Sequence, residues 1–255
     1  MLLIPFLAAG PAASANAVNG PDAASNNSLF VGGQFIDVSA GARGFTGDLD
    51  WIRSFSTGRS LNIGASSLSL AGTRWTYARL GVTAKPRSRA AFQLTTDLGR
   101  GTQGRQGFGY AAVRGAITYE AVPKRLYVEI EDQLLDVQET AGNIVKLGLV
   151  WPASASLVGR VAVHATTHGN VDTRALALRV DHARGGFSTF GGFAAGRSRP
   201  VLVGLGAGGK AQDLREVFAG AGMPLGRLRL TLALDWLTLG ETRRGSVALS
   251  VKIPL

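Results

Sequence analysis

The stretch LRLTLALDW, residues 228–236, alternates large apolar side chains with polar or small ones. Its leucines lie on one side of the alternation, and Arg229, Thr231 and Asp235 lie on the other. Successive side chains of a β-strand point to opposite faces, so this stretch predicts a strand with one apolar face. Its length is close to the nine to eleven residues that a tilted strand needs to cross a bilayer.

The same alternation continues from Leu29 to the end of the chain, with short turns rich in Gly, Pro, Asn, Asp and Arg between the segments. A soluble β-sandwich uses strands of about five or six residues, whereas these segments run to roughly nine to thirteen. We therefore predict an all-β fold, an antiparallel transmembrane β-barrel of about 14 strands within a range of 12 to 16. The candidate strands are 29–39, 43–55, 60–70, 73–84, 89–98, 107–120, 125–137, 143–151, 156–167, 171–182, 186–195, 200–206, 213–223, 227–238 and 245–253.

Fifteen candidates are one too many, because bacterial barrels of this kind have an even number of strands. The segment 200–206 is short and flanked by glycine, so we expect it to be the one that is not a strand.

Composition excludes several other classes of protein. The chain has 255 residues, of which 45% are hydrophobic, so it is not a disordered polymer. It has no cysteine, which excludes a disulfide scaffold and a thiolate metal site. Its 35 glycines are about twice the average usage, and glycine disfavours helices. No uncharged apolar stretch reaches the roughly 18–20 residues of a membrane helix.

The N-terminus resembles an export signal. An apolar run from Met1 to Gly10 precedes Ala15-Asn16-Ala17, which has the small-x-small form of a signal peptidase site. We predict a signal peptide over residues 1–17, a flexible lead-in over 18–28 and the barrel over 29–255.

The C-terminal segment SVALSVKIPL, residues 246–255, alternates to the end of the chain. With the signal-like N-terminus and the repeated strands, it makes the sequence resemble a Gram-negative outer-membrane β-barrel. The resemblance implies an outer-membrane location and recognition by the barrel-assembly machinery. Such proteins usually end in an aromatic residue, and this chain departs from that by ending in Leu255. Size and short turns are loosely similar to YaiO-type barrels, which are connected with surface polysaccharide.

The polar faces of the predicted strands carry charged side chains that we expect to line the lumen. Seven cationic residues stand against four acidic ones, a surplus of three that predicts an anion preference. The competing interpretation is a ladder of ion pairs that braces a closed barrel. The candidate lumen residues are Arg79, Arg114, Glu129, Glu131, Lys146, Arg160, His164, Arg179, Asp181, Arg229, Asp235 and Lys252.

Other motifs favour structural roles. Gly204, Gly206 and Gly209 spell G-x-G-x-x-G, but no βαβ unit surrounds them, so we interpret them as a glycine-rich hairpin. His164 and His168 do not predict a metal site, because four residues of strand separate them by about 13 Å. A hydrolase would need a Ser partner for such a histidine, and Ser154, Ser156 and Ser188 are the candidates.

Two further features concern the outer wall. Strict alternation would place Asp132 on the lipid face, so we expect it near the rim or moved by a bulge. The aromatic content is only 7%, so aromatic girdles at the membrane interfaces would be thin. The girdle candidates are Trp51, Trp75, Trp151, Trp236, Tyr119 and Phe108.

The leading hypothesis is a non-enzymatic outer-membrane barrel: a small pore, a surface-polysaccharide export accessory or a structural barrel. The alternatives are an outer-membrane lipid-modifying hydrolase and a soluble secreted β protein such as an adhesin. The net charge of +10 favours lipopolysaccharide phosphates, an anionic solute or a polysaccharide as partners. Nucleic acid is not expected, because the arginines are spread singly along the chain. No cofactor, metal or catalytic residue is predicted.

Overall fold

The computed structural model describes residues 27–39, 41–55, 58–87, 89–137, 140–168, 171–199 and 211–255. The predicted signal peptide, most of the lead-in, the segment 200–206 and the G-x-G-x-x-G motif lie outside these residues. The described residues form fourteen strands: β1 (Asn27–Val38), β2 (Ala42–Phe55), β3 (Arg59–Leu70), β4 (Thr73–Arg87), β5 (Ala90–Gln103), β6 (Gln106–Val122), β7 (Leu126–Val137), β8 (Thr140–Pro152), β9 (Leu157–His168), β10 (Val171–Arg184), β11 (Phe187–Arg199), β12 (Gln212–Leu225), β13 (Leu228–Leu239) and β14 (Thr242–Pro254).

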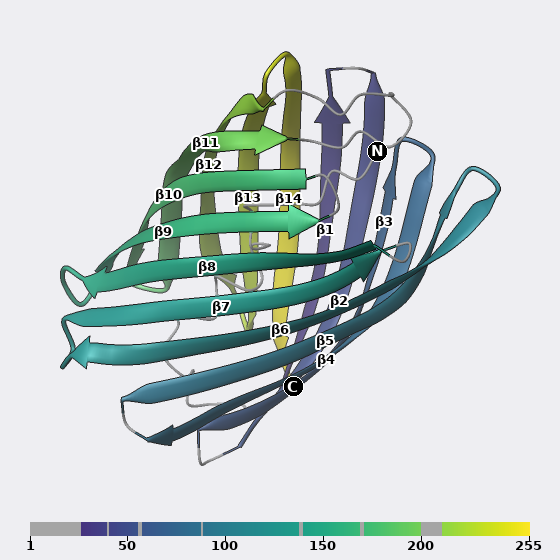
Figure 1. Cartoon of the computed structure of the whole chain (residues 1–255). Coiled ribbons are helices and arrows are strands. Elements are labelled where there is room, and N and C mark those ends of the chain that lie inside the picture. Colours follow the sequence, from purple (N-terminus) through teal and green to yellow (C-terminus); the bar gives the residue numbers. More distant parts are fainter. Residues whose placement is uncertain are drawn as a thin grey trace.

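Each strand pairs antiparallel with the next, and β1 pairs with β14, so the sheet closes into a barrel (Figure 1). The prediction of a barrel of about 14 antiparallel strands is thus confirmed. Closure leaves no sheet edge with unpaired backbone groups. Among the described residues, no helix is long and apolar enough to span a membrane.

Two rims bound the barrel. The proximal rim holds the start of β1 and the end of β14. There the Leu255 amide donates to the Asn27 carbonyl over 3.0 Å. The distal rim, at the other end, holds the C-terminal ends of the odd-numbered strands. Turns are short at both rims among the described residues. Between β10 and β11, for example, Gly185 and Gly186 have φ of 60° and 85°, which suits the type I′ turn favoured by two-residue hairpins.

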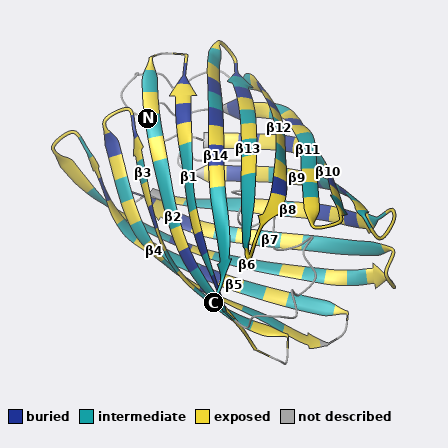
Figure 2. Ribbon diagram, turned by 180° about the vertical axis from the view of Figure 1, so that it is seen from behind, coloured by how far each residue is buried: buried dark blue, intermediate teal, exposed yellow. Residues whose placement is uncertain are grey.

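Exposed and covered residues alternate along the strands (Figure 2). In β13, Leu232 and Leu234 are 46% and 51% exposed on the outer face. Thr231 and Asp235 point the other way, into the barrel, and are more covered. An apolar outer wall around a more polar interior is the pattern of a membrane barrel.

Three sequence expectations need correction. The barrel begins at Asn27, so the last two residues of the predicted lead-in belong to β1. Trp75 and Phe108 lie on the inner face and are therefore not girdle residues. Each is separated by an even number of positions from the inward residues of its strand, β4 or β6. The outer face carries the other four candidates: Trp51, Tyr119, Trp151 and Trp236.

The third correction concerns Asp132. It lies in the middle of β7 on the outer face, neither at a rim nor moved inward. The register shift between β6 and β7 falls at Glu120/Val122, nearer the proximal rim, so it leaves the alternation at Asp132 unchanged.

Candidate functional site

The inner face of the barrel holds all twelve residues that the sequence suggested for the lumen. Each lies at an inward position of its strand, and the ion pairs among them lie within one strand or between adjacent or next-adjacent strands. The structure thus gathers most of these side chains in linked groups along the wall.

The largest group spans β7 to β10. Glu129 accepts from Lys146 Nζ over 3.4 Å and from Arg160 Nη1 over 3.2 Å. Arg160 Nε also donates to Asp181 over 3.1 Å, and Arg179 Nη2 donates to the same carboxylate over 2.6 Å. Asp181 is 3% exposed, and burial of a charge is tolerated only when it is paired. Three cations and two carboxylates therefore form one continuous ladder.

A second group lies on β2 to β5, with Arg79 at its centre. Arg79 Nε donates to Asp97 over 3.0 Å, and Arg79 Nη1 donates to Asp50 over 3.5 Å. The Ser66 hydroxyl donates to Asp48 over 2.5 Å. On β6 and β7, Arg114 and Glu131 are separated by 3.8 Å.

The third group, on β12 to β14 and β1, is the most deeply buried. Arg244 Nη2 lies 2.6 Å from Asp235 and 3.6 Å from Glu216, which is 1% exposed. The Ser246 hydroxyl also donates to Asp235, and the Gln34 amide donates to Ser246. One guanidinium thus serves two carboxylates.

The remaining predicted cations lie near the proximal rim. Arg229 donates to the Ser188 hydroxyl over 2.9 Å, and Lys252 lies over the Phe30 ring with Nζ 5.8 Å from the centroid. Arg229 and Lys252 are register partners on β13 and β14.

Sequence reasoning missed half a dozen inward charges, and they change the balance. The described strands place eight cationic and nine acidic side chains on the inner face, so the expected surplus of three positive charges is absent. Assigning each charged residue to a face by its even or odd position in its strand would have placed the missing residues on the inner face. They are Asp48, Asp50, Asp97, Glu120, Glu216 and Arg244.

Three separate apolar clusters occupy the inner face toward the distal rim, and we refer to them together as the apolar collar. Its members lie in the distal halves of their strands, and several are almost wholly covered: Val38 is 1% exposed and Val137 is 2% exposed. Neighbouring atoms therefore cover these side chains almost completely. The collar consists of Ile36, Val38, Leu68, Leu70, Ala112, Leu135, Val137, Ala175, Leu214, Leu237 and Leu239.

An aromatic tier joins the collar on β4 and β6. The Trp75 ring lies edge-on to Phe108, with centroids 5.5 Å apart, and 5.6 Å from Tyr110. Tyr77 lies 5.6 Å from Tyr110. Arg79 is 5.6 Å from the Tyr77 ring, so the tier borders the second charged group.

The histidines are not assembled into a catalytic site. His164 is inward, beside Lys146 in the register of β8 and β9, whereas His182 is exposed on the outer face. The backbone of His168 pairs with Val171. No hydrogen bond joins a serine to a histidine among the described residues, and no group of three metal-ligating side chains occurs among them. Ser188, one of the serine candidates, is held by Arg229.

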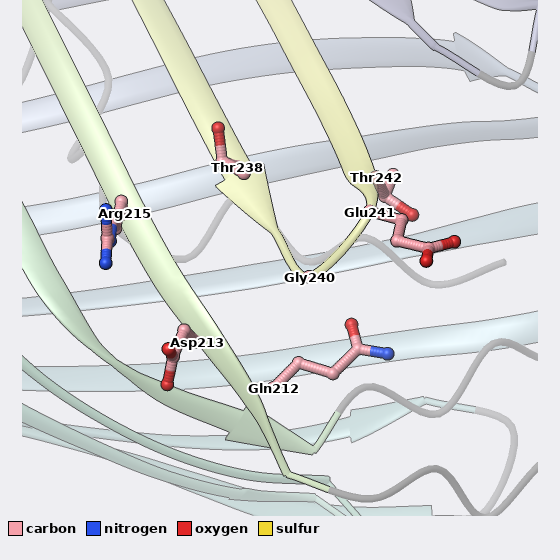
Figure 3. A pocket seen from close by; sticks show the side chains of 7 residues that line it. All are labelled: Gln212, Asp213, Arg215, Thr238, Gly240, Glu241 and Thr242. Carbon is pink, nitrogen blue, oxygen red and sulfur yellow. The ribbon is translucent and has the colours of Figure 1, made fainter.

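A separate depression of about 610 Å³ lies at the distal rim, between the ends of β12 and β14 (Figure 3). Gln212 extends from β12 toward the Gly240 turn, and Asp213 and Arg215 lie along the same strand. Asp213 is 3.8 Å from Arg197 on β11, and both are largely exposed. The depression is therefore a polar rim feature, and it lies apart from the linked charges of the lumen.

Comparison with known proteins adds evidence on the fold. No family model and no curated protein matches the sequence. Among solved structures, the CymD monoaromatic hydrocarbon channel matches with a TM-score of 0.65 at 8% identity, covering 89% of this chain and 87% of that one. The Pseudomonas putida toluene transporter TodX matches with 0.62 at 11% identity, covering 93% and 90%.

The fold is that of outer-membrane β-barrels. A third structure, described as a bacterial polysaccharide outer membrane secretin, matches with a TM-score of 0.56 at 12% identity over 91% of this chain and 99% of that one. These identities are low, so the likeness concerns the barrel architecture.

Proposed function

We propose that the protein is an outer-membrane channel that conducts ions poorly and passes compact apolar or amphipathic molecules. The observation that carries this proposal is the apolar collar, whose three clusters lie on the inner wall toward the distal end of the lumen. A hydrophobic constriction opposes ions because water and ions withdraw from it. An apolar molecule pays no such cost and gains by leaving water.

The barrel size supports a passage with a narrow section. Side chains fill a barrel of about eight strands, whereas barrels of about 16–18 strands leave an aqueous channel. Fourteen strands lie between these cases. The charges pair along the wall and not across the lumen, so these described ion pairs do not bridge the passage. Arg244, the register partner of Val38 and Leu237, lies at the depth of the collar.

The structural neighbours support the same proposal. CymD and TodX are described as channels or transporters of monoaromatic hydrocarbons and toluene, and they share this architecture. The proposal also includes residence in the outer membrane, export by the predicted signal peptide, assembly by the barrel-assembly machinery and contact with lipopolysaccharide.

Planar-bilayer recording tests the collar. Leu237→Asp places a charge in the collar and should raise single-channel conductance several-fold, because it admits water. Ala233→Asp is the matched control, since Ala233 lies on the same face of β13 below the collar. Equal conductance in the unmodified protein and both variants would refute the constriction.

A second candidate function rests on the aromatic tier. Aromatic rings stack on the apolar faces of sugar rings, so Trp75, Phe108 and Tyr110 could instead contact a saccharide during surface-polysaccharide export. Liposome swelling with maltodextrins, compared with toluene uptake, separates the two. Trp75→Ala should slow sugar entry only if the tier serves saccharides.

A further inference from the structure

Asp132 is an acidic side chain on the lipid-facing wall of the barrel. It is the seventh of the twelve residues of β7, and its neighbours on the same face are Ile130 and Leu134, which are 50% and 58% exposed. Its carboxylate makes no hydrogen bond or ion pair with any residue that the structure describes. Its location in the strand places it amid the apolar band, away from both rims.

The wall beside Asp132 is hollowed. Gly115 is its register partner on β6, and no atom lies within 4 Å of the point where a Cβ of Gly115 would stand. The missing side chain leaves a groove of about 440 Å³ across β4 to β7. Its outward lining is apolar apart from Asp132: Val82, Ala84, Phe92, Leu94, Ile117 and Ile130.

An unpaired carboxylate beside an apolar groove differs from an isolated charge on a solvent-exposed surface. A carboxylate in hydrocarbon is costly when nothing pairs with it, and ionisable residues within membrane spans commonly mark functional sites. Here the carboxylate stands at the side of an open groove whose volume suits a small apolar body. The apolar lining of the groove and the carboxylate of Asp132 therefore suit the same kind of ligand, an amphiphile with a hydrogen-bond donor.

We propose that this groove binds a membrane-dissolved lipophilic amine. Its hydrocarbon part would lie along Phe92, Leu94 and Ile117, and its ammonium group would donate to Asp132. A cationic donor both makes a charge-assisted hydrogen bond and neutralises the carboxylate, which an alcohol or an alkane does not do. The site lies outside the lumen, so this proposal does not depend on the proposed channel function.

A second copy of the chain fits the groove less well. Its lipid-facing wall would have to present a cation at mid-depth. In the described strands, every outward arginine with a described side chain lies within four residues of a strand end. An ammonium group carried by a small apolar molecule can reach Asp132, whereas these arginines remain near the rims.

Photolabelling of the purified protein in phosphatidylcholine vesicles tests the site. The probe is dodecylamine that carries a diazirine on its chain, and mass spectrometry maps the labelled peptides. We expect labelling on the peptides that contain Phe92, Leu94 and Ile117. Asp132→Asn should reduce this labelling about tenfold, the loss expected for a hydrogen bond to a charged group. Gly115→Leu fills the groove and should abolish it.

The controls use the same strand and the same probe skeleton. Asp136→Asn changes the next carboxylate on this face, which lies at the distal end of β7, and should leave labelling unchanged. Resistance of the unheated protein to unfolding on gels verifies that each variant is a barrel. Equal labelling by the diazirine-bearing alcohol, or no loss in Asp132→Asn, would overturn the proposal. Cross-linking of Asp132 to another chain would do so in favour of a second copy.

Discussion

The buried guanidinium of Arg244 shows how a single side chain can determine stability inside this barrel. It is the shared partner of Glu216 and Asp235, and all three side chains are at most 7% exposed. Arg244→Met would leave two carboxylates with no cation, and breaking a buried pair in this way costs about 3–5 kcal/mol. Urea unfolding in lipid vesicles, followed by tryptophan fluorescence, measures the loss.

Arg43→Met is the control for that experiment. The Arg43–Asp37 pair has a similar separation of 3.3 Å, but its side chains are 77% and 59% exposed. Exposed pairs contribute at most about 1 kcal/mol. A similar loss of unfolding free energy in both variants would contradict the importance of burial.

Ala71 is a residue whose replacement should stabilise the barrel. Its φ of 51° lies in the left-handed region, in the turn that connects β3 to β4. Glycine adopts this conformation without the strain of a Cβ, so Ala71→Gly should raise the free energy of unfolding by about 1 kcal/mol. Ala233→Gly, in the middle of β13, should instead lower it by about 0.5–1 kcal/mol. Loss of stability in Ala71→Gly would show that the turn is not strained.

At the scale of the strand, β13 separates the two faces of the wall. Leu232 is 46% exposed on the outside, and its neighbour Thr231 faces the lumen. A charge on the lipid face near mid-bilayer costs about 2–4 kcal/mol, so Leu232→Arg should destabilise the barrel far more than Thr231→Arg. Equal losses in denaturant titrations would contradict the face assignment.

The strands were predictable from the sequence because alternation is a local property. Thirteen of the fourteen pairings join consecutive strands. The even or odd position of a residue in its strand therefore also indicates whether its side chain points into the barrel or outward. The same parity applied to β2 would have found Asp48 and Asp50, which the sequence reasoning left out. Trp75 was assigned to a girdle by residue type, although its parity already indicated the lumen.

The linked groups could not be predicted in the same way. Arg244 contacts Glu216 two strands away, and this proximity depends on the register of β12, β13 and β14 together. The groove beside Asp132 likewise requires Gly115 to stand opposite it on another strand. Periodicity indicates which face a residue occupies, but by itself it does not identify the residue that stands opposite on the next strand.

Across the whole molecule, the balance of inward charges bears on ion selectivity. With eight cationic and nine acidic side chains, the wall should select only weakly between Cl⁻ and K⁺ once ions can pass the collar. Leu237→Ser widens and wets the collar without adding a charge. Under a KCl gradient, this variant should show a reversal potential near zero. A strong preference for Cl⁻ would contradict this balance and would support the anion preference predicted from the sequence.

Closure between β1 and β14 has a consequence for how the chain must fold. The other thirteen pairings can form in order as the polypeptide arrives, but this one joins residues 27–38 to residues 242–254. Until the last strand is delivered, the growing sheet has two open edges that can pair with other chains. Ring closure over such a separation is also slow, because its entropy cost precedes any gain from the contacts. The final dozen residues therefore control the timing of assembly, and a chain interrupted before them would remain an open, association-prone sheet.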